Sequence, residues 1–106
     1  MNIRMLPSLA LMVILTLLMV VAGVQVQAAD LSKGVEIYAE HCEYCHGPSG
    51  RGMAGMGELR PWKELMKPDV DLFDTIRDGS MAMPGFDGLL TSEEILDVIA
   101  YMRTFQ

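Results

Sequence analysis

The chain has 106 residues and a formal net charge of −6, from 14 acidic and 8 basic residues. An acidic balance excludes most nucleic-acid-binding proteins, because these need Lys and Arg to neutralise phosphates. The length allows one small domain, and a core of this size is only marginally stable alone. We therefore expect a covalent link or a cofactor to support the fold.

The first 28 residues have the order of a secretory signal peptide. One positive charge, Arg4, precedes an almost unbroken apolar run from Leu9 to Val24, and Val26 and Ala28 stand at the two positions that a signal peptidase reads. The run is shorter than the roughly 20 residues that span a bilayer as a helix. We expect export with cleavage after Ala28, and attachment to a membrane only if this segment is retained.

The rest of the chain, residues 29–106, holds all 14 acids and all but one of the 8 basic residues, so its net charge is 7 − 14 = −7. Export permits a disulfide. A bond between Cys42 and Cys45, the only two cysteines, would close a very short loop and would constrain almost none of the chain. A larger group must hold this domain together.

The first helix of the domain is predicted from Asp30 to His41. Asp30 is a suitable cap, and apolar or small residues recur at helical spacing on one stripe, namely Leu31, Gly34, Val35 and Tyr38. Residues 47–57, "GPSGRGMAGMG", contain five glycines and are predicted to be irregular. A short helical turn is expected at Pro61 to Met66.

Two further helices follow. Residues 69–78 start with an acid and end before Gly79, with Leu72, Phe73 and Ile76 predicted to face inward. The segment "SMAMPGFDG" reads as an extended loop. The last helix begins with a capping box between Thr91 and Glu94 and a hydrophobic staple between Leu90 and Ile95. Its predicted buried face is Ile95, Val98, Ile99 and Met102, with Tyr101 beside it. With no strand pattern or repeat, the fold class is all-α.

The segment "EHCEYCHG" carries the chemistry. Cys42, Cys45 and His46 are spaced i, i+3 and i+4, so in a helical conformation they share one face. C-x-x-C-H is the pattern for covalent haem attachment, in which both thiols form thioethers and the imidazole binds the iron.

Two other uses of this pattern remain open at this point. A thiol–disulfide oxidoreductase places C-x-x-C at a helix start after a strand, and no such strand is predicted here. A zinc site would need a fourth ligand beside Cys42, Cys45 and His46, which only His41 or a carboxylate could supply. We interpret His41 as an exposed residue at the helix end.

A haem iron bound by His46 needs a sixth ligand or an open site. Among the methionines, Met83 is the preferred candidate, because Pro84 disfavours the α conformation of the preceding residue and holds it extended on a loop between two helices. Met81 is the runner-up. Thioether ligation raises the reduction potential and leaves no place on the iron for a substrate.

With these segments the chain resembles the class I c-type cytochromes of the short bacterial monohaem kind. The resemblance covers residues 34–105 and rests on "GVEIYAEHCEYCHGPSGRG", "LFDTIRDGSMAMPGF" and "LTSEEILDVIAYMRTF". It implies one domain, residues 29–106, in which three to four helices pack around one covalent haem c. It also implies that the first and last helices cross closely, with Gly34 and Tyr38 facing Val98 and Tyr101.

For the site, the resemblance implies Met83 as the axial ligand opposite His46. It further implies that a backbone carbonyl near Pro48 or Pro61 accepts the other N–H of His46. Haem propionates are expected near Arg60 and Trp62.

We therefore predict an exported, periplasmic electron carrier that is not an enzyme and that passes single electrons between redox partners. The net charge of −7 predicts partners with a basic docking surface, although Arg60, Lys63 and Lys67 could form a local basic region. Two alternatives remain open. One is a haem subunit of a periplasmic oxidoreductase complex, and the other is a ligand-binding or peroxidatic haem protein with a labile sixth ligand.

Overall fold

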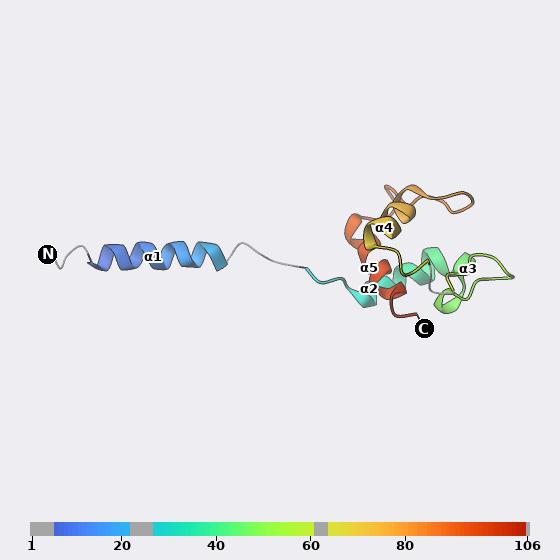
Figure 1. The fold of residues 1–106 in the computed structure, drawn as a ribbon, viewed down its shortest axis with the longest axis horizontal. Helices are drawn as coiled ribbons and strands as arrows, with labels where there is room; N and C mark the ends of the chain where they lie inside the picture. The colour runs from blue at the N-terminus through green and yellow to red at the C-terminus, as the bar shows by residue number, and fades with distance from the viewer. Residues whose placement is uncertain (1–5, 22–26, 61–63, 106) are drawn as a thin grey trace.

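The computed structural model describes residues 6–21, 27–60 and 64–105 (Figure 1). Regular structure in these ranges is helical, which confirms the all-α prediction. The α-helices are α1 (Leu6–Val21), α2 (Leu31–Ile37), α3 (Glu43–His46), α4 (Asp69–Asp78) and α5 (Ser92–Met102). A π-helical turn, Tyr38–Cys42, joins α2 to α3, and a 3₁₀ turn, Pro48–Gly50, follows α3.

The N-terminal helix α1 corresponds to the apolar run of the predicted signal peptide. In the part of the chain that the structure describes, no helix has both the length and the apolar character needed to cross a membrane. Cleavage after Ala28 and the start of the domain at residue 29 stay predictions.

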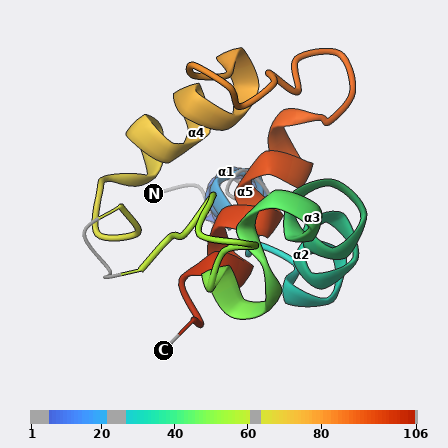
Figure 2. The same ribbon diagram turned by 90° about the vertical axis from the view of Figure 1, so that its right-hand side faces the viewer.

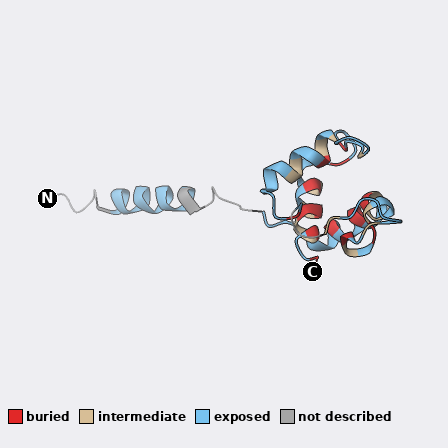
Figure 3. Ribbon diagram, turned by 45° about the vertical axis from the view of Figure 1, so that its right-hand side comes forward, coloured by how far each residue is buried: buried red, intermediate tan, exposed pale blue. Residues whose placement is uncertain are grey.

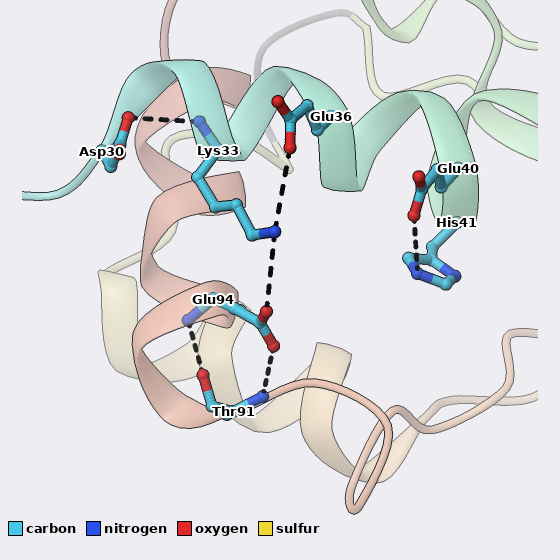
Figure 4. A network of polar contacts seen from close by, with 7 residues as sticks. All are labelled: Asp30, Lys33, Glu36, Glu40, His41, Thr91 and Glu94. Atoms are coloured by element: carbon cyan, nitrogen blue, oxygen red, sulfur yellow. Dashed lines mark hydrogen bonds and ion pairs between the residues drawn. The ribbon is translucent and has the colours of Figure 1, made fainter.

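The predicted first helix is confirmed, and it extends through the π-helical turn and α3 as far as His46. Asp30 caps it as expected, because its side chain accepts a hydrogen bond from the backbone N–H of Lys33 at 3.2 Å (Figure 4). The predicted buried stripe is partly wrong, since Leu31 and Val35 are about half exposed. The buried residues of this segment are Gly34, Ile37, Tyr38 and Cys42.

The close crossing of α2 and α5 at Gly34 explains this difference. A Cβ at Gly34 would collide with the backbone oxygen of Asp97 and lie 2.9 Å from Cβ of Tyr101. The backbone of α2 therefore packs directly on the backbone of α5 at Gly34. The side of α2 that contacts α5 continues along residues 37 and 38. Val35 is displaced from that line by about 100° around the helix. The implied close crossing of the first and last helices is confirmed.

Helix α4 has the predicted bounds and ends before Gly79. The three side chains predicted to face inward differ in burial: Ile76 is buried, whereas Leu72 and Phe73 are half-buried. Figure 2 shows α5 between α4 and α2. At the end of α5, a guanidinium nitrogen of Arg103 donates at 2.6 Å to the carbonyl of Lys67 and to Asp69, which ties α5 to the start of α4.

Helix α5 is the centre of the core. The predicted capping box is present: the N–H of Glu94 donates to Oγ1 of Thr91 at 3.2 Å, and the N–H of Thr91 donates to Oε2 of Glu94 at 2.9 Å (Figure 4). Leu90 and Ile95, the predicted staple, are both buried. Buried positions gather along α5 and the α2 helix that crosses it (Figure 3), and on α5 they are the predicted Ile95, Val98, Ile99 and Met102.

The helical turn predicted at Pro61 to Met66 falls partly outside the described residues, which exclude 61–63. Residues 64–66 do form a turn, and Leu65 in that turn is buried.

Candidate functional site

The π-helical turn and α3 present the two cysteines differently. Cys42, at the end of the π-helical turn, is 9% exposed, whereas Cys45 on α3 is exposed. Both thiols are free rather than joined in a disulfide. Burial raises the pKa of Cys42 to about 11. A reactive redox cysteine needs the opposite shift, because the thiolate is the nucleophile. This arrangement does not favour the thiol–disulfide oxidoreductase.

The zinc alternative also lacks support. Among residues 6–21, 27–60 and 64–105, no three His, Cys, Asp or Glu side chains come together in a way that could hold a metal ion. His41 is half-buried rather than exposed as predicted, and its ring packs edge-on against Phe86 with centroids 5.9 Å apart. Its Nε2 lies 3.6 Å from Oε2 of Glu40 (Figure 4).

His46, the last residue of α3, is oriented by one backbone carbonyl. Its Nδ1 lies 2.5 Å from the oxygen of Gly57. A proton on Nδ1 donates to that carbonyl and leaves the Nε2 lone pair available for a metal. The expectation of a carbonyl beside Pro48 or Pro61 needs correction, since the acceptor belongs to Gly57. The Pro48 carbonyl accepts from Arg51 N–H at 3.3 Å instead, and Pro61 lies outside the described residues.

Only glycine fits at position 57. Its φ is +68°, and a Cβ there would collide with the backbone oxygen of Cys45 and lie 2.8 Å from the carbonyl carbon. The loop that contains Gly57 therefore lies so close to the backbone of α3 that no side chain fits between them. The sequence signal was the glycine-rich composition of residues 47–57, which predicted irregular backbone without showing which carbonyl would meet His46.

Tyr38 anchors the other side of the same loop. Its hydroxyl donates to the carbonyl of Gly47 at 2.6 Å and accepts from the N–H of Gly50 at 3.1 Å. Burial raises the pKa of Tyr38 to about 12, and its ring packs edge-on against Tyr101 and Phe105 at centroid distances of 5.5 and 5.0 Å. Sequence reasoning placed Tyr38 at the helix crossing but missed this role of its hydroxyl.

The loop after α4 carries the two candidate methionines. Ser80 and Met83 pair through two backbone hydrogen bonds of 3.0 and 2.8 Å, with Met81 and Ala82 at the tip of the turn. The loop is tied back to α4 by a bond from Phe86 N–H to the carbonyl of Ile76 at 2.9 Å. Met83 is half-buried against the core, whereas Met81 is fully exposed.

Two cavities meet at His46 and Met83, which are the only ones of the described residues that line both. The smaller has a volume of about 240 Å³ and is lined by the cysteines and by His41, Met56, Gly57, Ala82, Pro84 and Phe86. The other, of about 290 Å³, is lined mainly by apolar and hydroxyl side chains: Leu59, Leu65, Leu72, Thr75, Ile76, Ser80 and Met102, with Glu64 and Lys67. Met81 lines neither.

A larger groove of about 690 Å³ lies elsewhere, between residues 27–30 and α5. Its lining includes Asp30, Asp69, Glu93, Asp97 and Arg103, and the described residues that line it carry neither a thiol nor an imidazole nor a thioether. Its size therefore does not make it the chemical site.

The residues around the two smaller cavities suit a haem. Two thiols, an imidazole whose Nδ1 faces the Gly57 carbonyl and a thioether line the smaller cavity, and that donor set matches covalent haem attachment with a histidine and a methionine ligand. Arg60 adds one feature: its Nε is buried and has no hydrogen-bond partner among the described residues. Trp62, the other residue expected near a propionate, lies outside the described residues.

Comparison with known proteins agrees with this site. Residues 29–102 match the family described as cytochrome C oxidase, cbb3-type, subunit III. The chain is 32% identical over 84 residues to cytochrome c6 of Synechocystis sp., covering 71% of this chain and 65% of that protein. It is 33% identical to cytochrome c6 of Thermosynechococcus vestitus, covering 71% and 70%, and 34% identical to that of Parathermosynechococcus lividus, covering 70% and 88%.

These matches confirm the resemblance noted in the sequence. The chain belongs to the family of small class I c-type cytochromes, all-α domains that have one covalently attached haem c and carry electrons rather than catalyse a reaction.

Proposed function

We propose that this protein is a monohaem electron carrier in which Cys42 and Cys45 attach the haem and His46 and Met83 bind its iron. The observation that carries the proposal is the pair of cavities that share His46 and Met83, one of them bordered by both cysteines. Cys42 and Cys45 would hold the haem through thioether bonds, each made by adding an S–H across one vinyl group, and neither thiol is part of a disulfide.

Met83 is preferred over Met81 because of where the loop holds each side chain. Met83 lines both cavities and packs against the core, whereas Met81 is 105% exposed and lines neither cavity. The Ser80–Met83 pairing and the bond from Phe86 to α4 keep the thioether of Met83 in that position. When bound, the haem supplies the one-electron redox chemistry, while the ligands and the burial set by the chain tune its potential.

An absorption spectrum of the protein produced with haem-maturation machinery tests the proposal. We expect the oxidised protein to show the weak red band typical of iron–methionine ligation, and the reduced protein not to bind carbon monoxide. Carbon monoxide binding by the wild-type protein would instead favour the ligand-binding haem protein.

The haem subunit of an oxidoreductase complex is kept as a second candidate, because the matching family is described as an oxidase subunit. Fractionation distinguishes the two. A free carrier is expected in the periplasmic fraction at the mass of one chain, whereas a subunit co-purifies with larger proteins from membranes.

Export to the periplasm is part of the proposal and rests on the order of residues 1–28. N-terminal sequencing of the haem-containing protein should find Ala29 first. A first residue upstream of Leu9 would mean that the apolar segment is retained as an anchor.

We further propose that the redox partner presents basic groups. The four aspartates of α4, Asp69, Asp71, Asp74 and Asp78, are exposed, and they outnumber the two arginines, Arg77 and Arg103, that pair with three of them. The local basic cluster expected near residues 60–67 is weakened, because Lys67 pairs with Glu64 at 2.6 Å and Arg60 is half-buried; Lys63 lies outside the described residues. Reaction rates with the native partner should fall as salt rises, since salt screens steering between exposed charges. Rates that stay constant or rise would contradict a basic partner.

A further inference from the structure

The 3₁₀ turn after α3 contains an unfavourable backbone conformation. Ser49 has a φ of +53°, in the left-handed region that residues other than glycine rarely adopt. The hydroxyl of Tyr38 closes this turn at both ends, because it donates to the carbonyl of Gly47 at 2.6 Å and accepts from the N–H of Gly50 at 3.1 Å. The two backbone groups also bond directly, at a longer 3.2 Å. A side chain from outside the loop therefore stabilises the turn.

This turn also fixes the carbonyl that faces the imidazole of His46. The carbonyl of Gly50 accepts a hydrogen bond from the N–H of Leu59 at 2.9 Å, and that bond joins the two ends of the loop. Gly57, whose oxygen lies 2.5 Å from Nδ1 of His46, comes shortly before Leu59 in the sequence. A shift of Gly50 would therefore move the Gly57 carbonyl relative to the imidazole.

Tyr38 belongs to the core and not to the loop, so it gives the turn a fixed reference. It is 2% exposed, and its ring packs edge-on against Tyr101 and Phe105 near the C-terminus. Phe105 also lies against the turn, since a Cβ at Gly50 would be 3.1 Å from Cδ2 of Phe105. The Tyr38 hydroxyl can therefore move little unless the crossing of α2 and α5 opens.

We propose that the Tyr38 hydroxyl is a positioning group for His46, and that it lowers the reduction potential of the haem by keeping the Gly57 carbonyl against Nδ1. This inference rests on the proposed function, in which His46 binds the iron. A hydrogen bond from Nδ1–H to a carbonyl makes an imidazole a stronger electron donor, and stronger donation stabilises the oxidised iron. Tyr38 lines neither of the two cavities that share His46 and Met83, so it acts through the loop and not by contact with the haem.

Tyr38→Phe in the haem-loaded protein tests the proposal, because it removes the hydroxyl and keeps the buried ring. We would measure the reduction potential in solution with soluble mediators, and the exchange of the His46 Nδ1 proton with water by NMR of the reduced protein. The chain has 2 histidines, so isotopic labelling of histidine leaves His41 as an internal reference. Loss of one neutral hydrogen bond changes an equilibrium by about twofold to tenfold. We expect proton exchange to be faster by that factor, and the reduction potential to rise.

Two controls separate the hydroxyl from other causes. Tyr101→Phe removes the same atom from the tyrosine of α5 that packs against Tyr38, with ring centroids 5.5 Å apart; the bonds to Gly47 and Gly50 come from Tyr38 instead. Ile99→Val shortens a core side chain of α5 that is 2% exposed, which lowers stability and leaves the loop unchanged. Both variants should keep the wild-type potential and exchange rate.

The proposal is overturned if Tyr38→Phe leaves either the potential or the exchange rate at its wild-type value, or if the potential falls. It is also overturned if either control shifts the potential and the exchange rate as much as Tyr38→Phe does. Failure of the proposed function would look different, because the wild-type protein itself would then lose its haem on denaturation or bind carbon monoxide when reduced.

Discussion

The crossing of α2 and α5 makes the substitution Gly34→Ala an informative test of the fold. In an isolated helix this change would stabilise the protein by about 1 kcal/mol, because glycine is a poor helix former. Here the new methyl group would collide with the backbone oxygen of Asp97 and lie 2.9 Å from Cβ of Tyr101. Neither atom is the end of a flexible side chain, so the two helices must move apart.

The expected size follows from these two opposing effects. Overpacking typically costs about 1–3 kcal/mol, and a collision with helix backbone belongs at the upper end. After the gain in helix propensity, we expect a net destabilisation of about 2 kcal/mol. For a domain of this size that corresponds to a fall in Tm of about 8–16 °C.

The assay is denaturant unfolding of the haem-loaded protein followed by circular dichroism, with thermal unfolding alongside. Ser32→Ala, at an exposed position of the same helix, is the matched control and should change the unfolding free energy by less than about 0.5 kcal/mol. A Gly34→Ala protein as stable as wild type, or more stable, would refute close backbone packing at this crossing.

Three further predictions concern the site. Met83→Ala should keep the haem attached, lower the reduction potential and open the reduced iron to carbon monoxide, whereas Met81→Ala should keep the haem and leave the potential and the absorption spectrum unchanged; the reverse result would assign the ligand to Met81. Replacing both Cys42 and Cys45 by Ala should give a largely unfolded chain by circular dichroism, because the small core depends on the haem, and a cooperative helical apoprotein would contradict this. The raised pKa of Tyr38, about 12 against 10.0 for a free tyrosine, should make stability fall as pH rises from about 10 to about 12. At most about 2.7 kcal/mol is lost, and Tyr38→Phe should lack this part of the pH dependence when compared by denaturant unfolding.

The local features of the sequence predicted the helices well. The bounds of α4 and the capping box of Thr91 and Glu94 both depend on interactions between residues no more than four positions apart. Such interactions are encoded by spacing alone, so they could be recognised without any knowledge of the tertiary fold. The same holds for the spacing of Cys42, Cys45 and His46, which by itself indicates a haem; their roles as haem ligands stay a proposal.

Burial along α2 depended on the tertiary fold. Leu31 and Val35 have the apolar character of core residues, yet they are about half exposed, because the contact with α5 is fixed by Gly34. Hydrophobic periodicity reports the presence of an apolar face but does not show where a neighbouring helix crosses it. A glycine has no side chain to mark it as a contact residue, so the periodicity misplaced the stripe.

The sequence by itself determined the class of the protein: the order of the helices, the haem-attachment pattern and the acidic character of the domain. Three details of the site were decided only by tertiary structure. They are the use of the Gly57 carbonyl to orient His46, the anchoring of the following loop by the Tyr38 hydroxyl, and the different positions of Met81 and Met83. The hydrogen-bonded groups of His46 and Gly57, and those of Tyr38 and Gly47, lie nine or more residues apart in the sequence. The loop of Met81 and Met83 is held by a hydrogen bond from Phe86 back to α4. Contacts of this kind form only when the chain folds back on itself, because no short-range spacing specifies which backbone group a distant side chain will meet.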